Sequence, residues 1–308
     1  MKDWTMIVNP ASASGTMAEK WKDYERLLTE GGLQVACQLT DHPGHAVDLV
    51  MAAASAGRRK FIVAGGDGTL HEVMTGLLRW CDAEHADMGM FTMAMLPSGT
   101  GNDWIRTAGV PQDDSAVQCI LAGHTAREDV VRLTFENGSF CMANVSGIGL
   151  DADICYYTNR LKKKGYVGRI IYKLMTPYAI FAKKCRPVEI VCDGVSIFKG
   201  KIFSVVIGNG LYRGGGYRQN EEGARWDDGL LEVSVMPAVR PVKAVIQMAH
   251  VLKGDFVTLP GILSHRFRKM TVTPLGGKPD RVESDGEIPG TLPLTVELTG
   301  QQIQIIVP

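Results

Sequence analysis

The chain has 308 residues, of which 45% are hydrophobic and 21% are charged. This composition is typical of a globular protein and differs from that of disordered or membrane-spanning chains. The 33 Lys and Arg residues equal the 33 Asp and Glu residues, so a general affinity for nucleic acid is not expected. The seven cysteines include no C-x-x-C pair, which argues against a disulfide framework and a structural zinc site.

The length favours two domains over one. The N-terminus passes from Met1-Lys2-Asp3 into an apparent strand without a charged and then apolar leader, and no apolar run is long enough to cross a bilayer. We therefore expect a cytoplasmic protein, with a peripheral position at the inner face of the membrane as a further option.

The first part of the chain alternates strands with helices. Short apolar or alternating runs predict strands at residues 4–8, 33–39, 61–63 and 91–96, and each is followed by a small polar loop and a helical pattern. Such alternation predicts a parallel, doubly wound α/β sheet. Ligands of such sheets bind beyond the carboxyl ends of the strands, where all of these loops lie.

The loop after the third strand is the strongest local signal. Gly65-Gly66-Asp67-Gly68 allows a tight turn, and Thr69 and Glu72 have the spacing of a capping box. Apolar residues then recur with helical spacing at Leu70, Val73, Met74, Leu77 and Leu78. Free N–H groups at the start of this helix predict a binding site for an anion such as phosphate.

Asp67 has two interpretations. A carboxylate beside bound phosphate would repel it, so Asp67 suggests a Mg²⁺ ion between protein and nucleotide. The alternative is that Asp67 only forms the turn, as Asp before Gly often does. The chain has neither the P-loop pattern nor the dinucleotide-binding G-x-G-x-x-G spacing, so the expected phosphate site is of another kind.

The pattern changes after about Asp129, and the second half reads as a β-rich domain. Asn137-Gly138 and Asp193-Gly194 predict hairpins. Residues 241–252 predict a helix. Further strands are expected at residues 130–135, 140–145, 188–191, 195–198, 201–207, 230–236, 267–273, 281–284, 294–298 and 303–307.

A basic segment interrupts this half. Nine Lys or Arg residues and no acid lie between Asp153 and Glu189, interleaved with aromatic residues. Such a segment is able to rest on an anionic membrane, so peripheral membrane contact through residues 160–186 is one hypothesis. The alternative is a solvated basic helix whose aromatic side chains pack on the core.

Five motifs together resemble the diacylglycerol kinase catalytic-domain family, in the family's order and over nearly the whole chain. This family includes soluble bacterial lipid kinases and sphingosine and ceramide kinases. The motifs are Asn9-Pro10 with Ser14-Gly15, Gly65-Gly66-Asp67-Gly68-Thr69 with Glu72, Pro97-Ser98-Gly99-Thr100-Gly101-Asn102-Asp103, Asp227-Asp228-Gly229-Leu230, and Asp285-Gly286-Glu287.

The resemblance implies an N-terminal α/β nucleotide domain related to NAD kinase and phosphofructokinase, followed by a β-sandwich. We place the first domain at residues 1–132, with the tail 292–308 as a candidate completion, and the β-rich substrate domain at residues 133–291. The resemblance further implies an ATP-dependent lipid kinase that uses Mg²⁺. No partner of nucleic-acid type is implied.

The resemblance also assigns roles by position. Residues expected around ATP are Asn9, Ser14, Gly15, Thr40, Gly66, Asp67, Gly68, Thr69, Leu70, His71, Glu72 and Thr100. A structural Mg²⁺ is expected at Asp228 with the backbone oxygens of Arg225 and Leu230, and Asp129 is expected in a Mg²⁺-linked network. Asp285 is the expected general base, with Glu287 beside it.

Three positions keep alternatives. Extra small residues between Pro10 and Gly15 leave open which serine touches phosphate. His71 stands where the family usually has Asn, so it is either a hydrogen-bond donor to the nucleotide or a helix-surface histidine without a role. Asp285-Gly286, without the resemblance, would be interpreted as a hairpin turn.

Two other functions stay open at this point. A kinase of a soluble substrate would share the Gly-Gly-Asp-Gly turn with NAD kinases, and a non-catalytic ATP-binding regulator would share the fold. A regulator would be expected to lack Asp67 or Asp285, and both are present. The identity of the lipid and the oligomeric state, including a homodimer, are not determined by the sequence.

Overall fold

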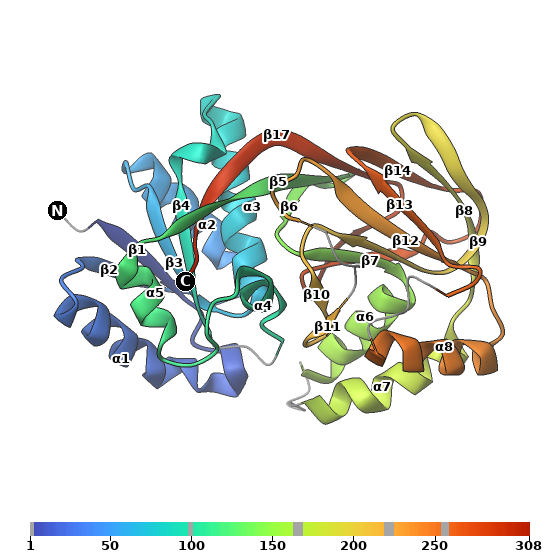
Figure 1. Ribbon diagram of the computed structural model, residues 1–308, viewed down its shortest axis with the longest axis horizontal. Helices are drawn as coiled ribbons and strands as arrows, with labels where there is room; N and C mark the ends of the chain where they lie inside the picture. Colours follow the sequence, from blue (N-terminus) through green and yellow to red (C-terminus); the bar gives the residue numbers. More distant parts are fainter. Residues whose placement is uncertain (1–2, 98–100, 163–168, 219–224, 254–258) are drawn as a thin grey trace. The chain divides into compact units, whose positions relative to one another are not determined.

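The computed structural model describes residues 3–97, 101–162, 169–218, 225–253 and 259–308. The chain forms two compact units, one of Met1–Val130 with Thr299–Pro308 and the other of Val131–Leu298. The strands β5 (Thr125–Phe135) and β17 (Leu294–Ile306) contribute residues to both units (Figure 1). The chain therefore leaves the first unit through β5 and returns to it through β17.

The first unit contains a parallel sheet with the strand order β17-β4-β3-β1-β2. Besides β17, its strands are β1 (Trp4–Val8), β2 (Val35–Leu39), β3 (Lys60–Gly65) and β4 (Thr92–Pro97). Every residue of β1 is buried, as is every residue of β3 except Lys60, which accounts for their continuous apolar runs. The predicted parallel α/β sheet is thus confirmed.

Helices connect these strands, as the sequence pattern predicted. They are α1 (Met17–Glu30), α2 (His45–Ser55), α3 (Asp67–Glu84), α4 (Asp103–Ala108) and α5 (Ala116–Ala122), with 3-10 turns at Ser12–Gly15 and Met88–Met90. All five apolar residues that predicted α3 are buried. A Cβ atom on Gly76 of α3 would lie 2.9 Å from the Val47 carbonyl oxygen of α2, so this glycine permits the close approach of the two helices.

The second unit is built on antiparallel strands. Its strands besides β5 and β17 are β6 (Gly138–Met142), β7 (Val145–Gly149), β8 (Arg186–Cys192), β9 (Val195–Gly208), β10 (Tyr212–Arg213), β11 (Tyr217–Arg218), β12 (Leu231–Pro237), β13 (Leu263–Phe267), β14 (Lys269–Pro274), β15 (Arg281–Ser284) and β16 (Glu287–Thr291). The order along its main path is β16-β15-β7-β9-β8-β14-β17. A core of aliphatic side chains from these strands, with Phe135 and Phe267, is buried between them.

Several strand boundaries differ from the prediction. The strands expected at 195–198 and 201–207 form the single strand β9, and those expected at 294–298 and 303–307 form β17. The strand expected at 140–145 ends at Met142, and β7 begins at Val145. The cause is distant in sequence, because the backbone N–H groups of residues 143–145 donate to the Asp285 carboxylate.

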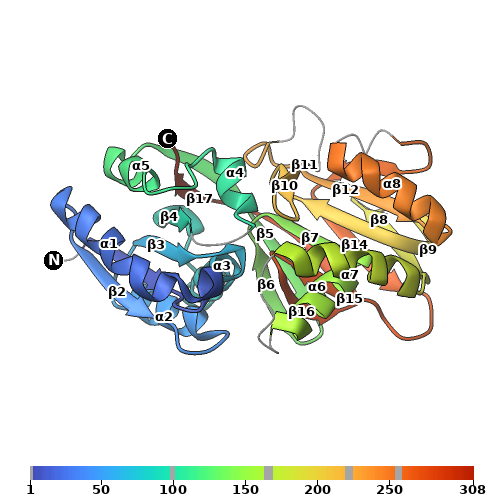
Figure 2. The same cartoon turned by 90° about the horizontal axis from the view of Figure 1, so that it is seen from below.

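Three helices complete the second unit: α6 (Leu150–Lys162), α7 (Arg169–Ala182) and α8 (Pro241–Lys253). Figures 1 and 2 show them together on one side of the strands, and a second core joins them to β9 and β12 through residues such as Ile180, Phe203 and Met236. The helix expected at 241–252 is therefore confirmed, and the basic segment is helical over α6 and α7. Among the described residues, no helix is long and apolar enough to span a bilayer.

Candidate nucleotide and phosphoryl-transfer site

The helix α3 begins at Asp67, with Gly66 as its N-cap residue in an extended conformation. The predicted capping box is wrong, because no side chain caps this helix. The N–H groups of Thr69 and Leu70 donate instead to the Gly66 carbonyl oxygen, at 2.9 and 3.1 Å. The first-turn N–H groups of a helix lack acceptors within the helix, and the helix dipole adds partial positive charge there. The start of α3 therefore suits an anion.

Asp67 connects the start of α3 to the start of α4. Its carboxylate accepts hydrogen bonds from the N–H groups of Asp103 and Trp104, at 3.2 and 3.3 Å. A Cβ atom on Gly101 would lie 3.0 Å from the same carboxylate, so glycine lets the loop pass close to the acid. Asp67 thus has a structural partner in a loop that the sequence places 36 residues away.

Glu72 connects the same helix to the start of α2. One carboxylate oxygen accepts the Gly44 N–H at 2.8 Å, and the other accepts the Ala46 N–H at 3.2 Å. Gly44 is the N-cap residue of α2 and has a φ of 89°. Glu72 therefore supplies the cap that α2 lacks from its own sequence, which explains why it does not cap α3.

Asn9 connects α3 to the end of β1. Its side-chain amide donates to the Thr69 hydroxyl at 3.0 Å, and its side-chain oxygen accepts the Ala11 N–H at 3.1 Å. Thr69 packs directly on β3, where a Cβ atom on Gly65 would lie 2.5 Å from the Thr69 hydroxyl. The predicted residues Asn9, Thr69 and Glu72 are thus brought together around α3.

The other residues predicted around ATP are placed less directly. Gly15 has a φ of 91° at the end of the first 3-10 turn, and the Thr40 N–H donates to the Val8 carbonyl oxygen just beyond β2. The Leu70 side chain is fully buried, and its N–H donates to the Gly66 carbonyl oxygen. The side chain of Ser14 and all of Thr100 lie outside the described residues.

His71 is not a helix-surface residue, which corrects one of the two interpretations of it. Its exposed fraction is 4%, and it lies within the buried face of α3. The sequence pattern missed this because His71 follows Leu70 directly, and α3 is buried on more of its circumference than a single apolar stripe indicates.

The acids predicted at metal positions have protein partners in this structure. Asp129 in β5 is buried and accepts a hydrogen bond from the Gln302 side chain at 2.8 Å. Asp228 forms an ion pair with Arg266 and accepts the Leu230 N–H at 3.1 Å. Since the guanidinium group already compensates the charge of Asp228, a Mg²⁺ ion there would compete with Arg266. The Arg225 side chain is engaged by Asp227 at 2.8 Å.

Asp285 and Gly286 form a two-residue hairpin turn between β15 and β16, with φ values of 50° and 89°. The Asp285 carboxylate is 4% exposed and accepts the N–H groups of residues 143, 144 and 145 at 2.9 to 3.0 Å. The Ser284 hydroxyl lies 3.3 Å from it. A carboxylate has about four acceptor positions, so as a base Asp285 would exchange one of these donors for a substrate hydroxyl. Glu287, next to the turn, is exposed.

Sequence reasoning missed a group of acids beneath this turn. Burial raises the pKa of the half-buried Glu283 well above its usual range, and the carboxylates of Asp285 and Asp151 raise it further, although the Gly286 N–H bonded to Glu283 lowers it. Asp151 in α6 is paired with Arg213 at 2.6 Å and with the Ser204 hydroxyl. A carboxyl group with a pKa raised in the way seen for Glu283 often marks a functional site. Because Asp151 and Glu283 are far apart in the sequence, no local pattern indicated that they lie together.

Comparisons with known proteins agree with this architecture. Residues 3–133 match the family profile of the diacylglycerol kinase catalytic domain, and residues 144–307 match that of the YegS C-terminal NAD kinase beta sandwich-like domain. The chain is 30% identical over 233 residues to the probable lipid kinase YegS of Salmonella heidelberg (strain SL476), covering 75% of this chain and 73% of that relative.

Two solved structures extend the comparison. A putative diacylglycerol kinase from Bacillus anthracis str. Sterne has a TM-score of 0.78 and 25% identity, covering 100% of this chain and 97% of that chain. An NAD kinase from Archaeoglobus fulgidus in complex with ATP has a TM-score of 0.50 and 11% identity, covering 98% and 93% of the two chains. This second likeness concerns the fold alone.

The two family profiles cover both units, and the Salmonella relative is named a probable lipid kinase. The chain belongs to the diacylglycerol kinase catalytic-domain family. The resemblance and the fold class inferred from the sequence are thereby confirmed.

The raised pKa of Glu283 predicts how stability varies with pH. Because the folded state holds this proton to higher pH than the unfolded chain, stability declines as the pH rises from about 4.3, the usual pKa of Glu, through the folded pKa. Glu283→Gln cannot ionise, so its melting temperature relative to the parent should increase between pH 5 and pH 8. Thermal unfolding across this range measures the difference.

The exposed neighbour provides the control for this experiment. Glu287→Gln also removes one carboxyl group beside the turn, but it should follow the parent curve. Parallel curves for the parent and Glu283→Gln would show that Glu283 ionises as an ordinary surface carboxyl group.

Proposed function

We propose that this protein is an ATP-dependent kinase that transfers the γ-phosphoryl group to the hydroxyl group of a lipid alcohol. The acceptor class comprises diacylglycerol, sphingoid bases, ceramide and similar long-chain alcohols. One observation carries the proposal: the α3 N-terminus lies at the carboxyl end of β3, with the Asp67 carboxylate in its first turn. Membership of a family of lipid kinases supports the choice of acceptor.

Mg²⁺ is the cation that fits this arrangement. In kinases it is held by one or two carboxylates and by the phosphates of the nucleotide. Asp67 supplies a carboxylate, and the partial positive charge at the start of α3 favours phosphate. When bound, the ion would neutralise charge on the phosphoryl group during transfer. Asn9 and Glu72 hold the neighbouring loops in place through Thr69, Gly44 and Ala46.

The acceptor class separates this function from its two alternatives. Labelled ATP and Mg²⁺ are incubated with the protein and, in separate reactions, a lipid extract, NAD and a set of sugars. Label in a lipid product supports the proposal. Label in NAD or a sugar would favour a kinase of a soluble substrate, and ATP binding without any transfer would favour a regulator.

Asp67→Asn tests the metal role. Removing the negative charge should lower turnover by about 10²-fold or more, while the loss of one helix-capping acceptor costs about 1 kcal/mol of stability. Lipid phosphorylation is measured over a range of Mg²⁺ concentrations, together with the melting temperature. Turnover at the parent rate with unchanged Mg²⁺ dependence would leave Asp67 with its structural role only.

Asp113→Asn is the matched control for this variant. Asp113 accepts the Ser115 N–H at 2.9 Å in an exposed turn of the same unit, so its replacement also weakens a local turn. We expect Asp113→Asn to keep parental turnover, which separates the effect of charge at the site from that of lost capping.

Asp285 is the proposed base that accepts the proton of the lipid hydroxyl. General base catalysis typically contributes about 10²- to 10⁴-fold. Asp285→Asn should therefore reduce turnover by about 10²-fold or more with little change in ATP affinity. It should also lower stability by about 1–3 kcal/mol, because one backbone N–H would then face an amide NH₂ group. Lipid phosphorylation, ATP affinity and melting temperature are measured together, and Glu287→Gln should have the smaller effect on turnover.

The chain contains a structural counterpart that controls for the turn. Asp193 also begins an Asp-Gly hairpin with a φ of 47°, and its carboxylate accepts the N–H groups of Arg268 and Lys269. Asp193→Asn should lose stability without losing turnover. If Asp285→Asn behaves in the same way, Asp285 is a turn residue and the base lies elsewhere.

A surface formed by α7 and α8 is the proposed membrane contact, and we call it the α7–α8 face. It consists of the exposed apolar side chains of Leu174, Tyr178, Phe181, Val242, Val245 and Ile246. These are six of the eleven large apolar side chains that are exposed in the described part of the chain. The two helices contact each other, so these side chains lie on neighbouring helices of the second unit.

Several apolar side chains of α8 are more exposed than is usual for a surface helix. Val242 and Ile246 are 67% and 62% exposed, whereas Gln247 is 7% exposed. Surface helices of globular proteins normally place apolar side chains toward the core and polar ones toward water. An apolar outer face is expected where the helix contacts a lipid surface.

The charges around this face are complementary to anionic lipid. Neither α7 nor α8 contains an acidic residue, and the side chains of Lys184, Arg240 and Lys243 are exposed. Lys183 and Arg186 from the predicted basic segment are instead paired with Asp280. Lys163 and Lys164 lie outside the described residues, as does the Lys162 side chain. The proposed contact is therefore partly apolar and partly basic.

Phe181→Glu combined with Ile246→Glu tests the α7–α8 face. Charged groups oppose apolar insertion, so binding to anionic vesicles should fall by about tenfold or more. Vesicle sedimentation measures binding at two salt concentrations, and salt should weaken binding of the parent. Val195→Glu is the control, because Val195 is 64% exposed in a hairpin of the same unit. Equal binding by the parent and the double variant would contradict the proposal. A loss of dimerisation in light scattering with unchanged vesicle binding would also contradict it, because the α7–α8 face would then be a contact between two copies of the chain.

A further inference from the structure

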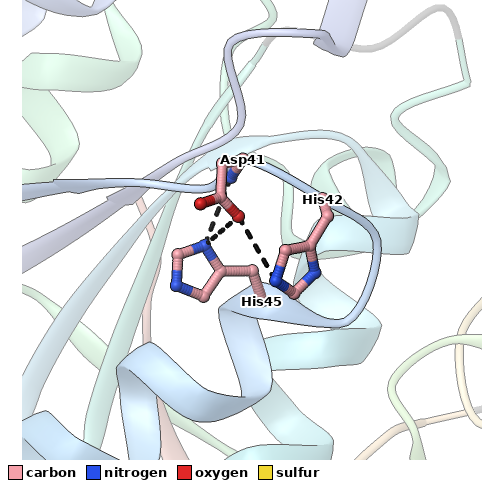
Figure 3. A group of neighbouring side chains, drawn as sticks. All are labelled: Asp41, His42 and His45. Atoms are coloured by element: carbon pink, nitrogen blue, oxygen red, sulfur yellow. Dashed lines mark hydrogen bonds and ion pairs between the residues drawn. The ribbon is translucent and has the colours of Figure 1, made fainter.

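Three potential metal ligands lie together in the loop between β2 and α2. Asp41 and His42 follow the end of β2, and His45 is the first residue of α2. Their ligand atoms lie within 4.8 Å of one another, and within the described residues no other group of three or more acidic, histidine or cysteine side chains converges in this way. Figure 3 shows both imidazole rings turned toward the Asp41 carboxylate.

Hydrogen bonds assign which ring nitrogens carry lone pairs. His42 Nδ1 lies 3.0 Å from the Pro43 carbonyl oxygen, which only accepts, so Nδ1 carries the hydrogen and Nε2 of the neutral ring has the lone pair. His45 Nδ1 accepts the Asp41 N–H at 3.2 Å through its one lone pair, so an ion bound at Nδ1 would replace this hydrogen bond. For His42, the Pro43 carbonyl oxygen at the other ring nitrogen is the usual kind of partner that orients a ligating histidine.

These lone pairs face the Asp41 carboxylate. Asp41 Oδ1 lies 3.3 Å from His42 Nε2 and 2.8 Å from His45 Nδ1. Acceptor atoms at such distances repel one another unless a ring N–H group or a cation lies between each nitrogen and the carboxylate. Two protonated rings would be stacked with centroids 4.8 Å apart, and they would share one carboxylate. A single divalent cation satisfies all three atoms without that repulsion.

The distances fit a common metal ion. With bonds of about 2.0–2.2 Å, ligand atoms around one ion lie about 2.9 Å apart at right angles and about 3.4 Å apart in a tetrahedron. Both distances from Asp41 Oδ1 fall in or next to this range. The His42 side chain is 59% exposed, so a small rotation about its side-chain bonds brings its ring into place.

We propose that Asp41, His42 and His45 form a binding site for a divalent transition-metal ion of the Zn²⁺ class. Two imidazoles and a carboxylate favour Zn²⁺, Co²⁺ or Ni²⁺ over Mg²⁺ or Ca²⁺, which prefer all-oxygen ligands. Asp41 is 71% exposed, so water completes the coordination of the ion. The site is distinct from the Mg²⁺ expected at Asp67 and does not depend on the proposed lipid kinase activity.

The position of the site suggests what the ion does. The N–H groups of Gly44 and Ala46, on either side of His45, are already held by Glu72 of α3. A metal bound by Asp41 and His45 would fasten the same short segment at a second point. The ion would therefore stiffen the start of α2 and the loop after Thr40.

Direct metal titration tests the proposal. The purified full-length protein is titrated with Zn²⁺ against a chromophoric chelator, and Co²⁺ binding is followed by visible absorption. We expect one ion per chain, with nitrogen and oxygen ligands in the Co²⁺ spectrum. His42→Gln and His45→Gln should each weaken Zn²⁺ binding by about tenfold or more. Zn²⁺ should raise the melting temperature of the parent and not that of Asp41→Asn.

Two controls accompany this metal titration: a histidine outside the cluster, and the cysteine thiols. His124 is exposed and lies outside the cluster, so His124→Gln should bind Zn²⁺ as the parent does. The described cysteines are free thiols and represent the competing ligands. Unchanged Zn²⁺ binding in His42→Gln and His45→Gln, or a thiolate spectrum with Co²⁺, would overturn the proposal, as would the absence of stoichiometric binding.

Discussion

Two carboxylates on one helix organise the candidate nucleotide site. Asp67, at the first position of α3, accepts N–H groups from the start of α4, and Glu72, five residues later, accepts N–H groups from the start of α2. Helix starts expose N–H groups that require acceptors, and neither α2 nor α4 has a side-chain cap of its own. The loops after β2, β3 and β4 are therefore held to one another by α3.

In the second unit a carboxylate also accepts backbone N–H groups, but these groups lie beside strands instead of at helix starts. The Asp285 carboxylate binds the N–H groups of residues 143, 144 and 145, the last of which begins β7, so β6 and β7 do not join into one strand. Cys155 and Asn159 of α6 both donate to the Gly286 carbonyl oxygen at 3.1 Å, so the other side of the turn is held as well. The residues that the family resemblance marks as catalytic are thus also the residues that position the backbone around them.

This double use affects how substitutions at the site are interpreted. A buried carboxylate that accepts several N–H groups destabilises the fold when it is removed, whatever its role in chemistry. Loss of activity alone therefore does not identify a catalytic residue in this protein. The second Asp-Gly hairpin at Asp193 is informative for this reason, since its carboxylate has similar backbone partners in an exposed turn.

The α7–α8 face and the cluster of Asp41, His42 and His45 illustrate two sources of binding capacity outside the candidate site. The first arises because helices that pack on β9 and β12 leave apolar side chains in contact with water. The second arises because a short loop brings two imidazoles to one carboxylate. In the first case apolar side chains face water, and in the second case ring nitrogens face a carboxylate oxygen.

The sequence by itself determined the fold class, the course of α3 and the Asp-Gly hairpins, because these follow from local periodicity and turn chemistry. Local chemistry also marked Asp67 as an unusual acid, whereas Asp285 was singled out by the family resemblance. Only the tertiary structure decided that Glu72 caps α2, that His71 is buried, that β9 and β17 run without a break, and that Glu283 has a raised pKa. Each of these depends on a partner dozens of residues away or on burial by several elements, and neither leaves a pattern in the neighbouring sequence.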